Sequence, residues 1–136
     1  MAKIIGLDIG GKRTGVAETD FMKIIASPKE TIATETLMDY LAQAFTKEPV
    51  EALVIGEPTH LHGGDSHNSE RVRHYEKLIR ETYPKLQVVL IDERFTSKMA
   101  SQALVHGGMR KSKRQDKSQL DKVSAAIILQ SYLDSK

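Results

Sequence analysis

The sequence predicts a single α/β domain whose core is a five-stranded mixed sheet. Its 136 residues match the roughly 100–150 residues of a typical domain. Three short apolar runs with short links open the chain, which is typical of antiparallel strands. Two further apolar runs alternate with segments of helical period, and this order indicates parallel strands joined by helices. We therefore expect one domain over 1–136, with helices on both faces of the sheet.

The expected antiparallel strands occupy the first 26 residues. Residues 3–9 are rich in β-branched side chains and end at Gly10–Gly11, so they indicate a strand followed by a turn. Residues 14–19 form a second, mixed run, and residues 23–26 form a third, which ends at Ser27 and the proline after it. Together these runs predict a meander of three strands.

A helix is expected after the meander. Leu37, Leu41 and Phe45 recur at helical spacing, and Thr34 or Thr36 can cap the first turn.

Two buried strands and three more helices complete the predicted order. Continuous apolar runs at 52–56 and 87–92 are typical of strands covered on both faces. Three segments carry helical patterns: one that Ser69 caps, with Val72, Tyr75, Ile79 and Tyr83 inward; one from Thr96 or Ser97 through Leu104 to Gly107; and one over 120–133.

The composition excludes several classes of protein. The absence of Cys rules out a disulfide framework, a zinc finger and a thiol nucleophile. Asp8 interrupts the apolar amino terminus, so a signal peptide is not expected. No segment approaches the ~20 apolar residues of a membrane span. We expect a cytoplasmic protein with no membrane partner.

The net charge of +2 conceals an uneven distribution. Residues 1–60 hold 6 basic and 9 acidic side chains, whereas residues 61–136 hold 14 basic and 9 acidic ones. Six of the thirteen residues at 110–122 are Lys or Arg. Such a block favours a polyanionic partner, although a solvated loop explains it equally well.

Acidic side chains stand at the ends of the predicted strands. Asp8 lies near the end of the first strand, Asp92 and Glu93 end the last, and Glu57 follows the middle one. In open α/β sheets, binding and active sites gather at the edge formed by the carboxyl ends of the strands. Asp121 shares a face of the last helix with apolar residues that should pack on the sheet. Strand alternation puts Asp92 and Glu93 on opposite faces, and the choice between them stays open.

Converging carboxylates predict a divalent metal site. Carboxylates that meet at a sheet edge repel one another and lose hydration, and a bound cation relieves both penalties. Mg²⁺ prefers oxygen ligands shared between carboxylates and phosphates. Two such ions about 4 Å apart can activate water and stabilise the leaving oxygen in phosphodiester hydrolysis. The pattern therefore favours a nuclease.

Each acid also has a structural interpretation. Asp8 can simply end its strand, and Glu93 can pair with Arg94 at the surface. Asp121 stands where the last residue of a helix capping box beginning at Ser118 would stand. From the spacing alone, this capping role is as good an explanation as metal binding.

Four motifs stand in order along nearly the whole chain: GLDIG at 6–10 with Arg13 and GVA at 15–17, VIG with Pro58 at 54–58, DERFTS at 92–97, and DKVSAAIIL at 121–129. Together they resemble the bacterial YqgF-type proteins. Holliday junction resolution or pre-16S rRNA cleavage is ascribed to that family, whose fold is ribonuclease H-like. The resemblance thus implies the same element order that the residue patterns predict.

The resemblance also implies the site residues. It carries over Asp8, Glu93 and Asp121 as a catalytic and metal-binding triad, and so selects Glu93 over Asp92. It implies Mg²⁺ or Mn²⁺ and a structured nucleic acid as substrate, and two ions are expected from the two-metal chemistry of phosphodiester hydrolysis. The expected phosphate contacts are Arg13 and Arg94 beside the site, and Arg110, Lys111, Lys113, Arg114 and Lys117 in the basic block.

Other binding motifs fit less well. Gly6 to Lys12 nearly matches a P-loop, but Arg13 replaces its Ser or Thr and a strand follows in place of a helix. The Asp-x-Gly-Gly sequence is also similar to the phosphate loop of sugar kinases and actin-like ATPases, which close two domains around ATP. We therefore expect no nucleotide cofactor. Four His at 60–74 are interpreted as loop residues, because a zinc site needs three ligands in fixed geometry.

The predicted function is that of a metal-dependent endonuclease, a hydrolase acting on structured RNA or branched DNA. Processing of the 5′ end of pre-16S rRNA in ribosome biogenesis is favoured. Holliday junction resolution is the first alternative, and a non-catalytic RNA-binding module for ribosome assembly is the second. A resolvase acts on two-fold symmetric junctions and should dimerise, so both a monomer and a homodimer are considered.

Overall fold

The computed structural model describes residues 2–57, 66–92 and 117–135, with the side chains of 66–68, 92 and 117–121 outside this description. Within these ranges the secondary structure comprises β1 (Lys3–Ile9), β2 (Arg13–Thr19), β3 (Ala26–Ala33), a 3₁₀ turn (Thr34–Thr36), α1 (Leu37–Lys47), β4 (Val50–Glu57), α2 (Ser66–Thr82), β5 (Gln87–Asp92) and α5 (Lys117–Asp134). The helix expected from Thr96 or Ser97 onwards lies outside the described residues.

The strands form one sheet in the order β3-β2-β1-β4-β5. β2 pairs antiparallel with both β1 and β3, whereas β4 pairs parallel with both β1 and β5. This mixed topology confirms the predicted fold class. It also brings the carboxyl ends of β1, β4 and β5 to a single edge of the sheet.

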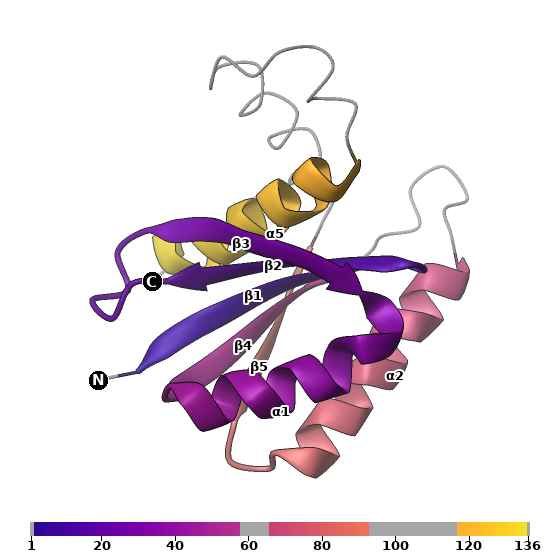
Figure 1. Ribbon diagram of the computed structural model, residues 1–136, viewed down its shortest axis with the longest axis horizontal. Coiled ribbons are helices and arrows are strands. Elements are labelled where there is room, and N and C mark those ends of the chain that lie inside the picture. Colours follow the sequence, from indigo (N-terminus) through magenta and orange to yellow (C-terminus); the bar gives the residue numbers. More distant parts are fainter. Residues whose placement is uncertain (1, 58–65, 93–116, 136) are drawn as a thin grey trace.

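Helices cover both faces of this sheet (Figure 1). Ile5 and Leu7 of β1 pack in the cluster that contains residues of α1 and α2, whereas Ile4 packs in the cluster formed with α5. Successive side chains of a strand point to opposite faces, so one short strand supplies both cores. None of the helices in the described parts of the chain has the length and apolar character needed to cross a bilayer.

The third strand differs from the sequence-based prediction. Residues 21–23 form a turn and a bend, Ile24 and Ile25 have no regular secondary structure, and β3 begins at Ala26 and includes Pro28. Asp20 Oδ1 accepts hydrogen bonds from the backbone N–H groups of Ile24 and Ile25, at 3.0 and 3.3 Å. The strand predicted at 23–25 is therefore wrong, because Asp20 holds the backbone of Ile24 and Ile25 in the loop between β2 and β3. Pro28 is tolerated because β3 is an edge strand, whose outward N–H groups need no partner strand.

Two helices begin earlier than their capping patterns suggest. α2 starts at Ser66, so Ser69 is a buried residue inside the helix and not its N-cap. α5 starts at Lys117, which places Ser118 inside the helix and Asp121 beyond its first turn. The capping-box interpretation of Asp121 is thus wrong, because a capping box requires Ser118 just before the first helical residue.

Neither threonine before α1 caps that helix with its side chain. The Thr34 hydroxyl lies 2.7 Å from the carbonyl oxygen of Gly10, to which it donates, and 2.9 Å from the hydroxyl of Thr14. The Thr34 N–H donates to the carbonyl of Lys12 at 3.0 Å. Thr34 therefore fixes the turn between β1 and β2.

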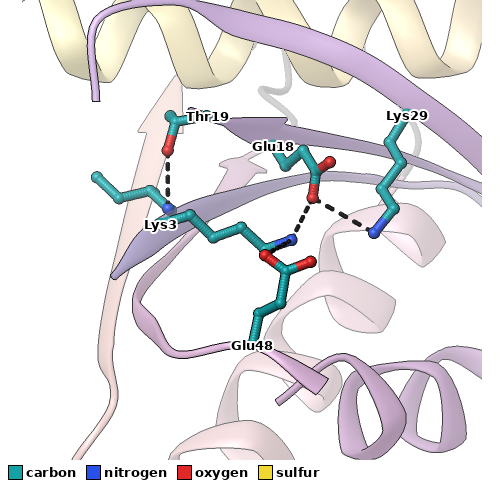
Figure 2. A network of polar contacts seen from close by, with 6 residues as sticks. Lys3, Glu18, Thr19, Lys29 and Glu48 are labelled. Carbon is teal, nitrogen blue, oxygen red and sulfur yellow. Dashed lines mark hydrogen bonds and ion pairs between the residues drawn. The ribbon is translucent and has the colours of Figure 1, made fainter. Parts of the chain in front are cut away.

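A partly buried ionic network closes the opposite end of β1 (Figure 2). The Lys3 ammonium, whose side chain is 6% exposed, pairs with Glu18 and also with Glu48 at 3.3 Å. Lys29 pairs with Glu18 at 3.3 Å. Burial is the largest influence on the pKa of Glu18 and raises it, but Lys3 and Lys29 together outweigh burial and hold this pKa below its usual range.

Glu18→Gln should lower the free energy of unfolding at neutral pH by about 1 kcal/mol. This size allows for the 30% exposure of the carboxylate, which weakens the ion pairs. Because the pKa of Glu18 is lower in the folded state, the carboxylate stabilises the fold at pH values above 4.5, the ordinary pKa of Glu. This stabilisation is lost as the pH falls through the folded-state pKa. In urea unfolding, the difference between wild type and variant should shrink below pH 4.5. Glu48→Gln is the control, because Glu48 is more exposed. An equal loss of unfolding free energy in Glu48→Gln would contradict the larger contribution assigned to Glu18.

Candidate functional site

The carboxyl-terminal edge of the sheet holds the predicted acids. Leu7 of β1 lies beside Ile55 of β4, and Glu57 of β4 lies beside Asp92 of β5. Asp8 follows Leu7 directly, so it stands at the same edge as the ends of β4 and β5. For Asp8, Glu57 and Asp92, this common edge is the arrangement that the sequence predicted.

The backbone of Asp8 is held by pairing with β2, and Leu7 just before it also pairs with β4. Asp8 lies opposite Gly15 of β2 and is half-buried. By strand alternation it shares the face of Ile4 and Gly6, which is the face that α5 covers. A carboxylate on this face is directed toward the helix that carries Asp121.

Close packing at Gly6 sets the distance between β1 and α5. A Cβ placed on Gly6 would lie 2.8 Å from Cβ of Leu129 and 3.0 Å from the carbonyl oxygen of Ala125. These distances are shorter than ordinary van der Waals contacts, so only glycine fits without a shift of the helix. The backbones of the strand and the helix therefore touch at this point.

The same contact brings the backbone positions of Asp8 and Asp121 to one edge. α5 runs antiparallel to β1. The side chain of Gln130 in α5 accepts a hydrogen bond from the N–H of Ala26. Ala26 pairs with Thr19 of β2, and Thr19 lies next to the amino-terminal end of β1. Asp8 lies two residues beyond Gly6, about 6.6 Å along the strand. Asp121 lies four residues before Ala125, about 6 Å along the helix. Both displacements lead from the Gly6 contact toward the same edge.

The third acid of the predicted triad, Glu93, lies outside the described residues, directly after β5. The side chain of Asp121 is also outside the description, so the triad stays a prediction. Across residues 2–57, 66–92 and 117–135, no three His, Asp or Glu side chains gather as a metal site. The donor set expected for the triad consists of carboxylate oxygens alone, which suits Mg²⁺ or Mn²⁺.

Few of the predicted phosphate contacts fall in the described parts. Arg13 is the first residue of β2; it is half-buried, and its carbonyl accepts a hydrogen bond from the N–H of Gly10 at 2.9 Å. Lys117 is the first residue of α5, so it belongs to a helix and not to a loop. The others lie outside the described residues: Arg94, Arg110, Lys111, Lys113 and Arg114.

The structure adds a basic residue that the sequence analysis missed. Arg71 of α2 places its guanidinium beside Gly11, in the turn between β1 and β2: a Cβ on Gly11 would lie 3.5 Å from each of Cζ, Nη1 and Nη2. Two residues on, Arg73 pairs with Glu57 at 3.8 Å. The missed signal was topological, because the helix that follows β4 begins near the edge at which β1 ends.

The histidine-rich segment is only partly a loop. His67 and His74 belong to α2, which corrects the interpretation of all four residues as loop histidines. The His74 ring lies edge-on to Tyr75, with ring centroids 5.3 Å apart. His60 and His62 lie outside the described residues.

Comparison with known proteins identifies the family of this chain. A family model described as "RuvX: Holliday junction resolvase" matches residues 2–135. A "Putative pre-16S rRNA nuclease" of Flavobacterium johnsoniae is 46% identical over 136 residues, which are 100% of this chain and 99% of that protein. A protein of the same name from Phocaeicola vulgatus is 43% identical over 136 residues, 100% of this chain and 98% of its own.

A solved structure supports the fold. RuvC of T. thermophilus, in complex with a Holliday junction substrate, superposes with a TM-score of 0.61 at 14% identity, and the match covers 99% of this chain and 95% of that one. At this identity the likeness concerns the fold, and it confirms the ribonuclease H-like architecture. The family model and the full-length relatives together show that this chain belongs to the RuvX family.

Proposed function

We propose that this chain is a metal-dependent endonuclease that cleaves phosphodiester bonds in structured RNA and processes the 5′ end of pre-16S rRNA. The observation that carries the proposal is the convergence of Asp8 with the backbone of Asp121. The contact at Gly6 holds β1 and α5 so close that both acidic positions reach the edge where β5 ends. Glu93, the residue after β5, would complete a triad with them. The names of the full-length relatives support rRNA as the substrate.

The triad would hold the metal through oxygen ligands alone. Asp8, Glu93 and Asp121 would bind Mg²⁺ or Mn²⁺, and two bound ions supply a nucleophilic water and stabilise the leaving oxygen. Asp8 belongs to β1, a strand that is paired on both sides, so the backbone that carries this ligand is rigid. Arg13, at the start of β2, would contact a backbone phosphate next to Asp8. Processing of ribosomal RNA would place the protein in the cytoplasm.

Cleavage in the presence and absence of metal tests the proposal. An end-labelled RNA containing the 5′ flank of 16S rRNA is incubated with the full chain and Mn²⁺, Mg²⁺ or excess EDTA. We expect a discrete product with either metal and none with EDTA. Metal-independent cleavage would contradict the proposal. So would salt-sensitive RNA binding without any cleavage, which would favour the non-catalytic RNA-binding module.

Cleavage of a four-way DNA junction is the second candidate function. The description of the matching family and the junction-bound RuvC structure favour it. Assaying the RNA and the junction in parallel separates the two functions by their rates. A junction-cleaving protein should also form a homodimer on its symmetric substrate, whereas an RNA-processing protein can act as a monomer. Light scattering with and without junction DNA measures this difference.

A further inference from the structure

We infer that Arg71 of α2 is a phosphate-binding residue of this nuclease, which grips the backbone of the nucleic acid a few nucleotides from the cleavage point; the inference rests on the proposed function. The observation that carries it is the position of the Arg71 guanidinium over Gly11, at the turn that follows Asp8. Neither charge clustering nor motif matching singles out Arg71, which lies 60 residues away from this turn along the chain.

The guanidinium lies flat against the turn. The Cβ position of Gly11 is 3.5 Å from Cζ, Nη1 and Nη2 alike. A point equidistant from these three atoms at that distance lies above the guanidinium plane and not beyond its edge. Arg71 thus presents its face to the glycine, and its N–H groups point along the surface of the turn. The edge of the guanidinium that carries these N–H groups is the part of arginine that recognises phosphate, with two parallel hydrogen bonds.

Both sides of this contact are fixed before any ligand binds. On the helix side, the neighbouring Val72 and also Ile79 are buried in the core, which fixes the position and rotation of α2. On the turn side, Thr34 donates hydrogen bonds to the carbonyl oxygens of Gly10 and Lys12. An arginine held between two rigid elements loses little further freedom on binding, and this preorganisation favours affinity.

The surroundings match a polyanion. Exposed Lys12 and half-buried Arg13 follow Gly11 directly, so three cationic residues meet at this turn. Asp8 lies three residues before Gly11, so the two Cα atoms are at most about 11 Å apart. The phosphates of one strand of a B-form duplex follow one another every ~3.4 Å of helix axis, so a strand with one phosphate at Asp8 would present another to Arg71 a few nucleotides away.

Arg73 offers a matched control on the same helix. It stands two residues from Arg71, its side chain is 70% exposed, and it pairs with Glu57. Residues two apart on a helix do not share a face. Arg73→Ala therefore removes the same charge from the same helix without touching the turn.

Binding of the 5′-flank RNA tests the inference. Non-cleaving Asp8→Asn protein is titrated with labelled RNA between 50 and 200 mM salt, alone and combined with Arg71→Ala, Arg71→Lys or Arg73→Ala. For Arg71→Ala we expect about tenfold weaker binding and a loss of about one from the slope of log K against log salt. Arg71→Lys keeps the charge but not the planar fork, so its affinity should be intermediate with the slope retained. Arg73→Ala should change binding less than about threefold.

A steric variant separates position from charge. Gly11→Val leaves every charge in place but puts a side chain where the guanidinium lies, so it should weaken binding about as much as Arg71→Ala. In the cleaving protein, Arg71→Ala should raise KM about tenfold with little change in kcat, because the contact is made equally before and during the reaction. A purely structural Arg71 would instead lower the melting temperature and leave the salt slope unchanged.

The outcomes distinguish this inference from the proposed function. If the wild type cleaves RNA while Arg71→Ala binds and cleaves like Arg73→Ala, the role of Arg71 is refuted and the nuclease stands. If the wild type binds and cleaves neither RNA nor junction DNA, the proposed function fails and the inference fails with it. Should Arg71→Ala not fold, Arg71→Lys decides: wild-type affinity in that variant refutes the bidentate contact.

Discussion

Asp8→Asn is expected to reduce the rate of metal-dependent cleavage by about 1,000-fold or more, which corresponds to about 4 kcal/mol of transition-state stabilisation. The substitution keeps the shape of the side chain but removes the negative charge that would hold the cation at the end of β1. Single-turnover cleavage of the 5′-flank RNA with saturating protein and Mn²⁺ measures the loss. Titration calorimetry with Mn²⁺ should show weaker metal binding in the same variant.

Glu57→Gln is the matched control for Asp8→Asn. Glu57 ends β4 at the same edge of the sheet, is 41% exposed and pairs with Arg73. Removal of this neighbouring charge should change the rate by less than about threefold, because Glu57 lies outside the proposed triad. Equal residual cleavage by Asp8→Asn and the wild type would refute the role of Asp8. Equal losses in the two variants would show that the edge acts only through its overall negative charge.

Gly6→Ala is expected to lower the free energy of unfolding by about 2 kcal/mol, with a larger loss for Gly6→Val. The added methyl group would lie 2.8 Å from Cβ of Leu129 and 3.0 Å from the carbonyl oxygen of Ala125, and neither is the end of a flexible side chain. The helix α5 must therefore move away from β1. Since α5 also carries Asp121, cleavage should fall even where the variant stays folded. Urea unfolding and single-turnover cleavage measure the two effects.

Gly11→Ala is the control for the steric argument. A Cβ at Gly11 meets its nearest atoms at 3.5 Å, which is ordinary van der Waals contact. Its stability should therefore match that of the wild type within about 0.5 kcal/mol. A similar loss in both variants would mean that glycine is needed for the flexibility of its backbone and not for close packing against α5.

Local patterns were sufficient to predict most of the elements. The β-branched run at 3–9 and the apolar run at 87–92 became β1 and β5, because strands covered on both faces leave a continuous apolar signal. The apolar face of the last helix was also predicted correctly, with Ala125, Ile128 and Tyr132 buried. In these segments, the residues that are buried in the fold are also the residue types that favour the observed strand or helix.

The edge strand β3 was misplaced for the opposite reason. Its residues are mostly half-buried or exposed, so burial leaves little alternation in the sequence. The strand was predicted at the apolar residues just before it, whereas hydrogen bonds from the N–H groups of Ile24 and Ile25 to the side chain of Asp20 hold these residues in a loop. Propensity favoured the wrong segment because it does not register a side chain that bonds the backbone four or five residues away.

The order of residues along the chain was enough to predict the fold class, the place of Asp8 at a strand end and, through the motifs, the family. These follow from the covalent order of residues and from periodicities that depend only on strand or helix geometry. The packing of α5 against Gly6 and the position of Arg71 over Gly11 became visible only in the folded chain. Both contacts join residues at least 60 positions apart, and they arise because parallel strand order brings the ends of distant elements to one edge.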